Sequence, residues 1–337
     1  MNHRPSDHPA PLLSLRDLVT TIETDHGIVR AVSHVSLDLH PGKSLGIVGE
    51  SGSGKSILAK SILKLLPKNA NVSGESKISF DGLDLNQMSS KALNSVRGTR
   101  IAMVFQDPAS SLNPVMTIGR QITESLIHHL GMGKNTARNR SVELLRSVGI
   151  PNPGQRIRQY PHQLSGGMRQ RVAIAIALAC DPRILIADEP TTALDVTVQA
   201  EILDLLAQKQ AENKMSMILI THDLGVVAGR TDDIAVMYAG RIVEQAPARQ
   251  LFSATRMPYT RALMNSIPRL GNRPHTRLNS IAGHSPDLAN LPRGCSFAPR
   301  CPRVGKQCIR QMPPLSCDDS SKDHLFACWN PMKGADG

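Results

Sequence analysis

Eight consecutive residues have the types and spacing of a phosphate-binding loop: Gly49-Glu50-Ser51-Gly52-Ser53-Gly54-Lys55-Ser56. They match the pattern G-x-x-x-x-G-K-[ST]. Glycines let the backbone bend tightly, so that its N–H groups point at phosphate oxygens with a helix N-terminus behind them. In this pattern Lys55 reaches the β- and γ-phosphates, and the Ser56 hydroxyl is a ligand of Mg²⁺. The competing interpretation is a Gly/Ser-rich surface turn. The apolar strand before the loop and the helix after it favour binding of a nucleoside triphosphate.

Polar side chains follow three further apolar runs. Asp188 and Glu189 end the run that begins at Ile184, Gln106 follows Phe105, and His222 follows the run that ends at Ile220. At a strand end beside Ser56, Asp188 can hold Mg²⁺ through water. Glu189 is placed to polarise or deprotonate the water that attacks the γ-phosphate. Gln106 can coordinate Mg²⁺ and that water, and His222 can hydrogen-bond the γ-phosphate and hold Glu189. Strand-capping acids and a structural histidine are the alternatives.

A second glycine-containing loop, Leu164 to Gln170, opens an apolar helix that includes Val172 to Cys180. It contains Ser165, Gly166 and Gly167, and its geometry is that of a second helix N-terminus able to receive phosphate. The first loop already accounts for the nucleotide. One chain therefore carries two phosphate-facing helix ends.

The elements that must position these groups can be read from apolar spacing. Leu12 to Thr20 and Ile28 to Leu39 alternate apolar and polar residues, which predicts half-buried antiparallel strands. Buried strands are predicted before each polar residue named above, and a helix over Ile57 to Leu66. Residues 118–148 have a helical pattern, closed by a Pro/Gly-rich connection. This arrangement predicts an α/β fold: a nucleotide-binding sheet, an antiparallel β subdomain and an inserted helical subdomain at about 107–164.

Composition limits the class of protein. The chain has 337 residues, of which 40% are hydrophobic and 20% charged, as in globular proteins. Its longest apolar run, Val172 to Cys180, is far shorter than the roughly 20 residues that cross a bilayer. The polar segment 1–11 is expected to be flexible and lacks the apolar core of a secretory signal, so we expect residence in the cytoplasm. A net charge of +11 suits nucleic acid or an anionic membrane face, or is simply a solvated basic surface.

The ordered set of motifs resembles the nucleotide-binding subunit of an ATP-binding cassette (ABC) transporter, a P-loop NTPase with a RecA-like core. The resemblance covers roughly residues 12–250 and rests on the phosphate loop, Gln106, the loop at Ser165, Asp188-Glu189, Ala193-Leu194-Asp195 and His222. Stretches such as Ser111-Leu112-Asn113-Pro114 and Met237-Tyr238-Ala239-Gly240 resemble the importer branch for oligopeptides, dipeptides and nickel. Within that branch, two stretches resemble the D-type ATPase subunit more than the F-type: Ala102-Met103-Val104-Phe105 and Tyr238-Ala239-Gly240.

The resemblance implies head-to-tail dimers, in which Ser165, Gly166 and Gly167 of one chain, with Asp195 nearby, complete the γ-phosphate site of the other. The implied partners are a related F-type ATPase chain, two transmembrane permease subunits that dock a short helix on the helical subdomain, and an external solute-binding protein. The implied place is the cytoplasmic face of the inner membrane. Many cassettes stack an aromatic ring on adenine, and the nearest ring here is His26, for which an ordinary turn residue is the alternative.

Three functions follow with different weight. The first is ATP hydrolysis that drives import of di- or oligopeptides; the second is the same role for nickel or another solute. The third is a soluble ABC ATPase that acts on nucleic acid or ribosomes. Such proteins usually carry tandem cassettes or a long coiled coil that splits the cassette. This sequence has one uninterrupted cassette without a heptad run, so we expect no nucleic-acid partner.

Residues 251–337 form a predicted C-terminal extension that holds five of the six cysteines: Cys295, Cys301, Cys308, Cys317 and Cys328. Disulfides are disfavoured in the cytoplasm, which favours ligation of a metal or cluster. The spacing lacks the close C-x-x-C pairs of structural zinc. Some members of the branch hold a four-iron cluster, and the resemblance assigns Cys295, Cys301, Cys308 and Cys328 to a 4Fe-4S cluster. Zn²⁺ on the same residues is the alternative, then reduced thiols. Cys317 is either another ligand or a spare thiol.

Overall fold

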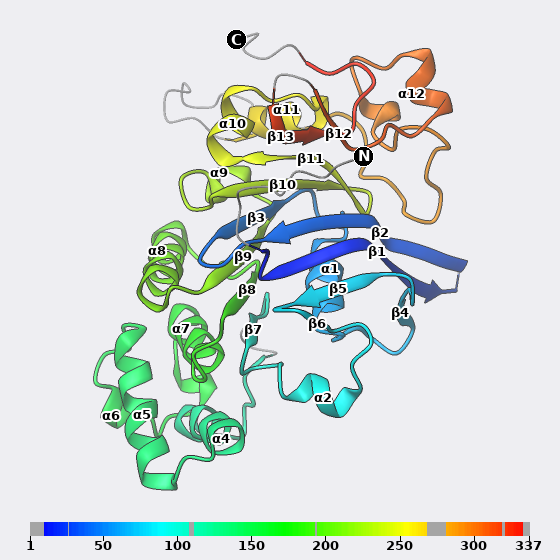
Figure 1. Ribbon diagram of the computed structural model, residues 1–337. Coiled ribbons are helices and arrows are strands. Elements are labelled where there is room, and N and C mark those ends of the chain that lie inside the picture. The colour runs from blue at the N-terminus through cyan, green and yellow to red at the C-terminus, as the bar shows by residue number, and fades with distance from the viewer. Residues whose placement is uncertain are drawn as a thin grey trace.

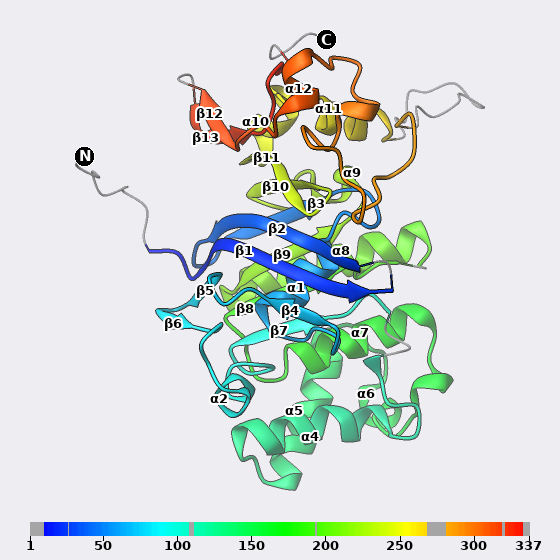
Figure 2. The same ribbon diagram turned by 90° about the vertical axis from the view of Figure 1, so that its right-hand side faces the viewer.

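The computed structural model describes residues 10–25, 27–107, 111–192, 194–267, 281–318 and 321–332. The predicted adenine-stacking residue His26 and most of the predicted flexible segment 1–11 lie outside these ranges. Within them the molecule has three tiers: a helical group at one end, two sheets in the middle and a C-terminal extension at the other end (Figures 1 and 2).

The main sheet has eight strands in the order β12-β13-β11-β10-β3-β9-β8-β7. Its centre is parallel and apolar because both faces are covered. The parallel strands are β3 (Ser44–Val48), β7 (Ile101–Val104), β8 (Ile184–Asp188), β9 (Ser216–Thr221) and β10 (Asp233–Tyr238). β11 (Arg241–Pro247) runs antiparallel to β10. The strands predicted before the phosphate loop, Gln106, Asp188 and His222 are confirmed.

A smaller antiparallel sheet has the order β2-β1-β5-β6, with β4 (Ala70–Val72) paired to β1. The predicted pair is confirmed and is longer than expected: β1 is Leu13–Thr24 and β2 is Gly27–Leu39. β5 (Lys77–Phe80) and β6 (Leu83–Asp84) complete the sheet. α1 (Lys55–Ile62) packs against both sheets, and its Leu58 and Ile62 are buried in the core between them.

The helical pattern of residues 118–148 forms two helices, α4 (Ile118–Leu130) and α5 (Lys134–Ser147). They separate at Gly131, whose φ of 64° is left-handed, a conformation that ends helices and favours glycine. The other helices of the cassette are α2 (Ser90–Asn94), α6 (Pro153–Arg156), η1 (Pro161–Gln163), α7 (Gly166–Ala177), α8 (Val196–Asn213) and α9 (Leu224–Val227). α4, α5 and α6 gather at the lower end of Figure 1, beyond the edge strand β7.

The extension continues the main sheet. It contains α10 (Ala248–Ser253), α11 (Pro258–Asn265), η2 (Ala298–Arg300), α12 (Lys306–Arg310), β12 (Ser316–Asp318) and β13 (Ser321–Phe326). β13 pairs with β11, where the buried Glu244 accepts hydrogen bonds from the backbone N–H groups of Arg256 and Met257 and lies 2.8 Å from Nε2 of His324. α10 crosses the predicted boundary at residue 250. The extension and the cassette therefore share one sheet.

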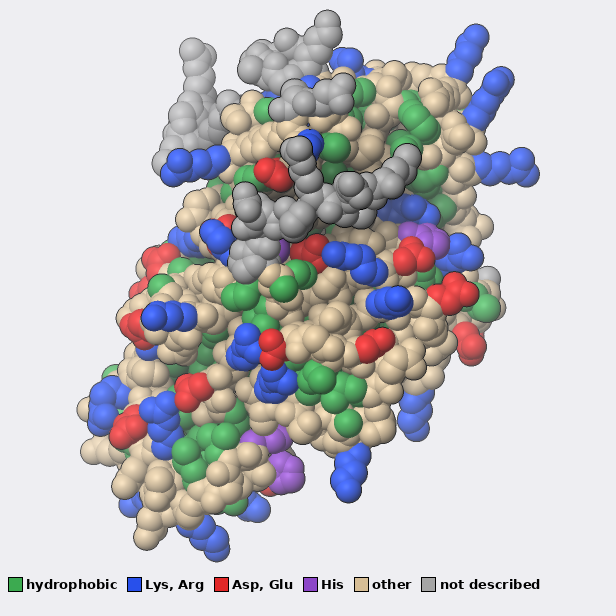
Figure 3. All heavy atoms as spheres, viewed as in Figure 1, with side chains coloured by type: hydrophobic (Ala, Val, Ile, Leu, Met, Phe, Trp, Pro, Cys, Tyr) green, Lys and Arg blue, Asp and Glu red, His purple; other side chains and the backbone are tan. Residues whose placement is uncertain are grey.

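Two surface properties bear on the partners. Among the described residues, no helix has both the length and the apolar character needed to cross a bilayer. Lys and Arg side chains are scattered over the face shown in Figure 3, with acidic side chains among them. On this face the positive charge of the chain is not gathered into one patch.

Candidate functional site

Four adjacent strands deliver the predicted site residues to one edge of the main sheet. β3, β9, β8 and β7 are parallel neighbours in that order. The phosphate loop follows β3, His222 follows β9, Glu189 follows β8 and Gln106 comes two residues after β7. Because parallel strands end together, residues far apart in the sequence meet at the carboxyl edge of the sheet.

The phosphate loop lines a hollow of about 310 Å³. Ser51, Gly52, Gly54, Lys55 and Ser56 form its floor, and Gln106 and Glu189 lie on its wall. The tight path of the loop needs glycine at two positions in particular. Gly54 has φ 102°, and a Cβ there would lie 2.2 Å from the carbonyl oxygen of Ala31; at Gly49 it would lie 2.1 Å from that of Met237. The loop is thus pressed between β2 and β10.

Lys55 is buried, with 4% of its surface exposed. Its Nζ donates hydrogen bonds to the carbonyl oxygens of Gly49 (2.8 Å) and Glu50 (2.9 Å). Burial lowers the pKa of Lys55, and the nearby carboxylates of Glu189, Asp188 and Glu50 partly oppose this. The ammonium group therefore faces the hollow from a desolvated position, where an anion is attracted strongly.

Ser56 and Asp188 form the predicted magnesium pair. The hydroxyl of Ser56 donates to Oδ1 of Asp188 at 2.9 Å, and Asp188 is buried. Burial raises the pKa of Asp188, with the Ser56 hydrogen bond acting in the opposite direction. A cation beside the carboxylate would offset this desolvation, and hydroxyl and carboxylate oxygens are ligands that Mg²⁺ accepts. The two side chains fit a magnesium site that phosphate oxygens and water complete.

Three side chains converge on one oxygen, Oε2 of Glu189. Nε2 of Gln106 donates to it at 3.1 Å, Oγ1 of Thr192 donates at 3.0 Å, and Nδ1 of His222 lies 3.4 Å away. Glu189 has a left-handed φ of 45°, and its backbone N–H donates to the carbonyl of Ile220 on β9. The backbone and three neighbours thus fix the carboxylate beside the hollow. Thr192 was not predicted; its place in the turn after Glu189 was the available signal.

The second predicted phosphate loop lies apart from this hollow. None of Ser165, Gly166, Gly167 and Asp195 lines it. Ser165 caps α7 by accepting a hydrogen bond from Met168, and Asp195 caps α8 by accepting one from Val198. Ser165, Gly166 and Asp195 are exposed. Within one chain, the residues of the two loops do not form one site.

Glu50 is turned away from the hollow, towards the extension. Its backbone N–H donates to the hydroxyl of Tyr259 at 2.9 Å, and its carboxylate accepts two hydrogen bonds from Arg300, at 2.6 and 2.9 Å. The extension also places Leu288 on the wall of the hollow, and Ile22 and Val29 supply apolar wall from β1 and β2. None of these five neighbours was predictable from the sequence, because no local pattern links them to the loop.

Four of the five cysteines of the extension lie near one another. Burial raises the pKa of Cys295 and Cys301, and that of Cys328 to about 11, and in each case neighbouring cysteines of the group add to the shift. Cys308 is buried, its carbonyl accepts a hydrogen bond from the N–H of Cys295, and a Cβ at Gly294 would lie 2.1 Å from that carbonyl. Cys317 is exposed and is not among them. Among the described residues, no three His, Cys, Asp or Glu side chains are spaced to hold a metal ion.

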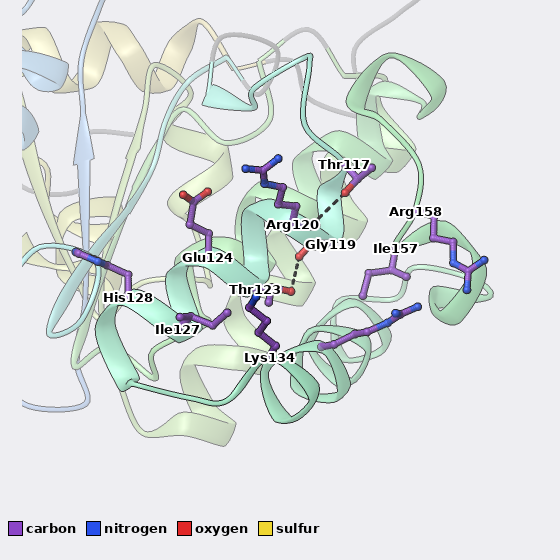
Figure 4. A pocket seen from close by; sticks show the side chains of 11 residues that line it. Thr117, Gly119, Arg120, Thr123, Glu124, Ile127, His128, Lys134, Ile157 and Arg158 are labelled. Carbon is purple, nitrogen blue, oxygen red and sulfur yellow. Dashed lines mark hydrogen bonds between the residues drawn. The ribbon is translucent and has the colours of Figure 1, made fainter.

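A larger hollow, about 840 Å³, lies on the helical group and not at the phosphate loop (Figure 4). Basic side chains from α4, α5 and the segment after α6 line it together with Ile127 and Ile157. Glu124 is its acidic member. None of the predicted catalytic residues lines it.

Comparison with known proteins yields two family matches. Residues 32–192 match the family described as ABC transporter, and residues 243–308 match the oligopeptide/dipeptide transporter C-terminal region. The chain is 47% identical to the dipeptide transport ATP-binding protein DppD of Bacillus subtilis, over 94% of each chain. It is 49% identical to the oligopeptide transport ATP-binding protein OppD of the same organism, over 94% of this chain and 88% of that one.

Solved structures agree with the fold. A dimeric ATP-binding cassette in a post-hydrolysis state, bound to ADP and Pi, is 30% identical and superimposes with a TM-score of 0.63. The match covers 70% of this chain and 99% of the other. The part of the chain that this likeness leaves uncovered is about the size of the predicted extension.

Proposed function

The chain belongs to the ABC transporter family of ATP-binding proteins, and we propose that it hydrolyses ATP to drive the import of dipeptides or oligopeptides through membrane subunits. The match of residues 243–308 to the oligopeptide/dipeptide transporter C-terminal region carries the peptide assignment. The names of the two Bacillus relatives support it. Nickel or another solute is the alternative cargo.

The roles of the site residues follow from their chemistry. Lys55 exchanges its loop carbonyls for phosphate oxygens when the nucleotide enters. Glu189 is the general base, and Gln106, Thr192 and His222 hold its carboxylate towards the attacking water. Ser56 and Asp188 would hold Mg²⁺, which would supply positive charge against the phosphates when bound. Ile22 and Val29 offer an apolar wall to the adenine ring of the nucleotide.

The second half of the site comes from another ATPase chain. Ser165 is the N-cap of α7, and Gly166 and Gly167 are its first residues, where the N–H groups of the first turn and the helix dipole favour an anion. In a head-to-tail dimer these residues reach the γ-phosphate on the opposite chain. ATP then joins the two chains, and its hydrolysis releases them. A related F-type chain is the proposed mate.

The helical group receives the membrane subunits at the cytoplasmic face of the inner membrane. A hollow of about 160 Å³ at its junction with the main sheet supports this, because Phe105, Leu112 and His129 line it. Phe105 is 37% exposed and precedes Gln106. A short apolar helix of a permease that binds in this hollow would move together with Gln106, the residue that contacts Glu189.

Reconstitution tests this function. The chain is reconstituted in lipid vesicles together with the external binding protein and the permease subunits that are encoded beside its gene. ATP turnover is then measured with a dipeptide, a pentapeptide or Ni²⁺. We expect the peptides, and not Ni²⁺, to stimulate turnover and to accumulate inside. Stimulation by Ni²⁺ alone assigns the other cargo. Tight, salt-sensitive DNA binding without permeases would contradict the importer role.

For the extension we propose a 4Fe-4S cluster on Cys295, Cys301, Cys308 and Cys328. The mutual proximity of their thiols supports a four-thiolate site. A single Zn²⁺ needs its four sulfurs much closer together, at about 2.3 Å from one point. Zn²⁺ on the same four residues is the alternative.

Anaerobic purification followed by iron and sulfide assays tests the cluster. We expect four iron atoms per chain, a loss of iron in Cys308→Ser and no loss in the matched control Cys317→Ser. One equivalent of zinc without iron would identify the alternative, and equal losses in both variants would remove the assignment of the four ligands.

A further inference from the structure

The phosphate loop has a partner outside the cassette. Arg300 lies in η2 of the extension, and its guanidinium forms a two-pronged ion pair with the carboxylate of Glu50. The side chain of Arg300 is only 6% exposed and that of Glu50 is 22% exposed. Planar, two-pronged pairs are the strongest and most directional form of this contact. Because the pair is largely desolvated, the loss of one member leaves the other charge uncompensated.

A second contact holds the same residue through its backbone. The hydroxyl of Tyr259 on α11 accepts a hydrogen bond from the N–H of Glu50. Tyr259 is fully buried and packs against Tyr238 and Phe297, with ring centroids 4.5 and 5.3 Å away. The Tyr259 hydroxyl and the Arg300 guanidinium therefore both contact Glu50 beside a buried aromatic cluster. The rings of this cluster come from β10, α11 and the segment before η2.

Arg300 also connects this contact to the segment that walls the hollow. Its Nε donates to the carbonyl of Ala282 at 2.8 Å, and Leu288, six residues later, lines the nucleotide hollow. The orange segment of the extension descends past β10 towards β3 in Figure 2. The same arginine thus fixes the phosphate loop and the chain that leads to the hollow's wall.

We propose that Arg300 and Tyr259 are positioning residues that hold the phosphate loop from the side of the extension, so that the extension sets the affinity of the chain for ATP. This inference rests on the proposed function, because it concerns the same nucleotide site. A loop that already has its binding conformation binds phosphate without a further ordering cost. Loss of the contacts that hold this conformation therefore weakens ATP binding. By thermodynamic reciprocity, ATP in turn favours the docked extension.

Nucleotide affinity of the full-length chain is the primary test. We expect Arg300→Met to raise the Kd for ATP about tenfold, Arg300→Lys about threefold because charge remains but the fork is lost, and Tyr259→Phe about threefold. The KM for ATP should rise in the same proportion while kcat at saturating ATP changes by less than about twofold. Partial unfolding would instead lower kcat and leave KM unchanged.

Two controls make the result specific. Arg310→Met changes an exposed arginine of the same extension and should leave the Kd unchanged. Glu50→Gln should match Arg300→Met in size, and the double variant should be no weaker than either single variant, since both changes remove one interaction. The only tryptophan, Trp329, lies in the extension, so its emission maximum reports whether each variant keeps the extension folded.

The outcomes separate two failures. An unchanged Kd in Arg300→Met, with native Trp329 emission, overturns the positioning role. Additive effects of Glu50→Gln and Arg300→Met overturn it as well. If Arg300→Met loses native Trp329 emission, the test passes to Arg300→Lys and Glu50→Gln. An unchanged Kd for ATP in these two variants, with native emission, then overturns the positioning role. Failure of the unaltered chain to bind ATP refutes the proposed function itself.

Discussion

The two phosphate-facing helix ends of this chain differ in how complete they are. The loop before α1 is enclosed: Lys55 and Asp188 are buried, and Ser56 and Asp188 are already hydrogen-bonded. The loop before α7 is open, with Ser165 and Gly166 exposed and no contact to the hollow. Both are helix N-termini with similar local electrostatics. The first end is assembled from residues of this chain alone, whereas the second end contributes nothing to that hollow and, in the proposed dimer, would face the nucleotide of the opposite chain.

Replacement of the general base gives the largest expected effect and tests the enclosed half alone. Glu189→Gln should lower kcat about 10²- to 10³-fold, because the amide cannot accept the proton from water. ATP binding should persist, and the closed dimer should accumulate with ATP and Mg²⁺ on size-exclusion chromatography. Glu201→Gln, an exposed acid on α8, is the control that keeps turnover. Normal turnover of Glu189→Gln would remove the residue from its assigned role.

A change in the open half should separate binding from turnover. Ser165→Ala removes a hydroxyl and the cap of α7, so we expect ATP-dependent association and turnover to fall about tenfold while ATP affinity of the monomer is unchanged. The matched control is Ser89→Ala, because Ser89 caps α2 with the same 3.3 Å hydrogen bond as Ser165. Both variants should lose about 1 kcal/mol of helix stability. Weaker ATP binding by Ser165→Ala monomers would contradict the division into halves.

The smallest expected effect is a gain in stability from the enclosed half. Because the folded pKa of Asp188 is raised, ionised Asp188 lowers the stability of the nucleotide-free chain above that pKa, and the penalty disappears as the pH falls through it. Asp188→Asn should raise the melting temperature by about 2 °C at neutral pH. The gain should shrink at lower pH. The exposed control Asp204→Asn should show no gain, and a lower melting temperature of Asp188→Asn at neutral pH would contradict this account.

Much of the cassette was predictable because its chemistry is local. The phosphate loop, Glu189 and His222 each follow an apolar strand and Asp188 ends one, and an apolar strand that leads into polar residues is a short-range pattern. Gln106 was found in the same way. The convergence of Gln106, Thr192 and His222 on one oxygen of Glu189 was not visible in the sequence, because it depends on the order β3-β9-β8-β7 of strands that are far apart along the chain.

By itself, the sequence determined the nucleotide chemistry, the order of the cassette elements and the family, since each depends on residue types at short, fixed spacings. Only the tertiary structure decided how the extension is used. Two hundred and fifty residues separate Glu50 from Arg300, and no periodicity records a contact of that range. A shared sheet and an aromatic core bring them together, because buried apolar surface and paired backbone groups fix the positions of distant segments.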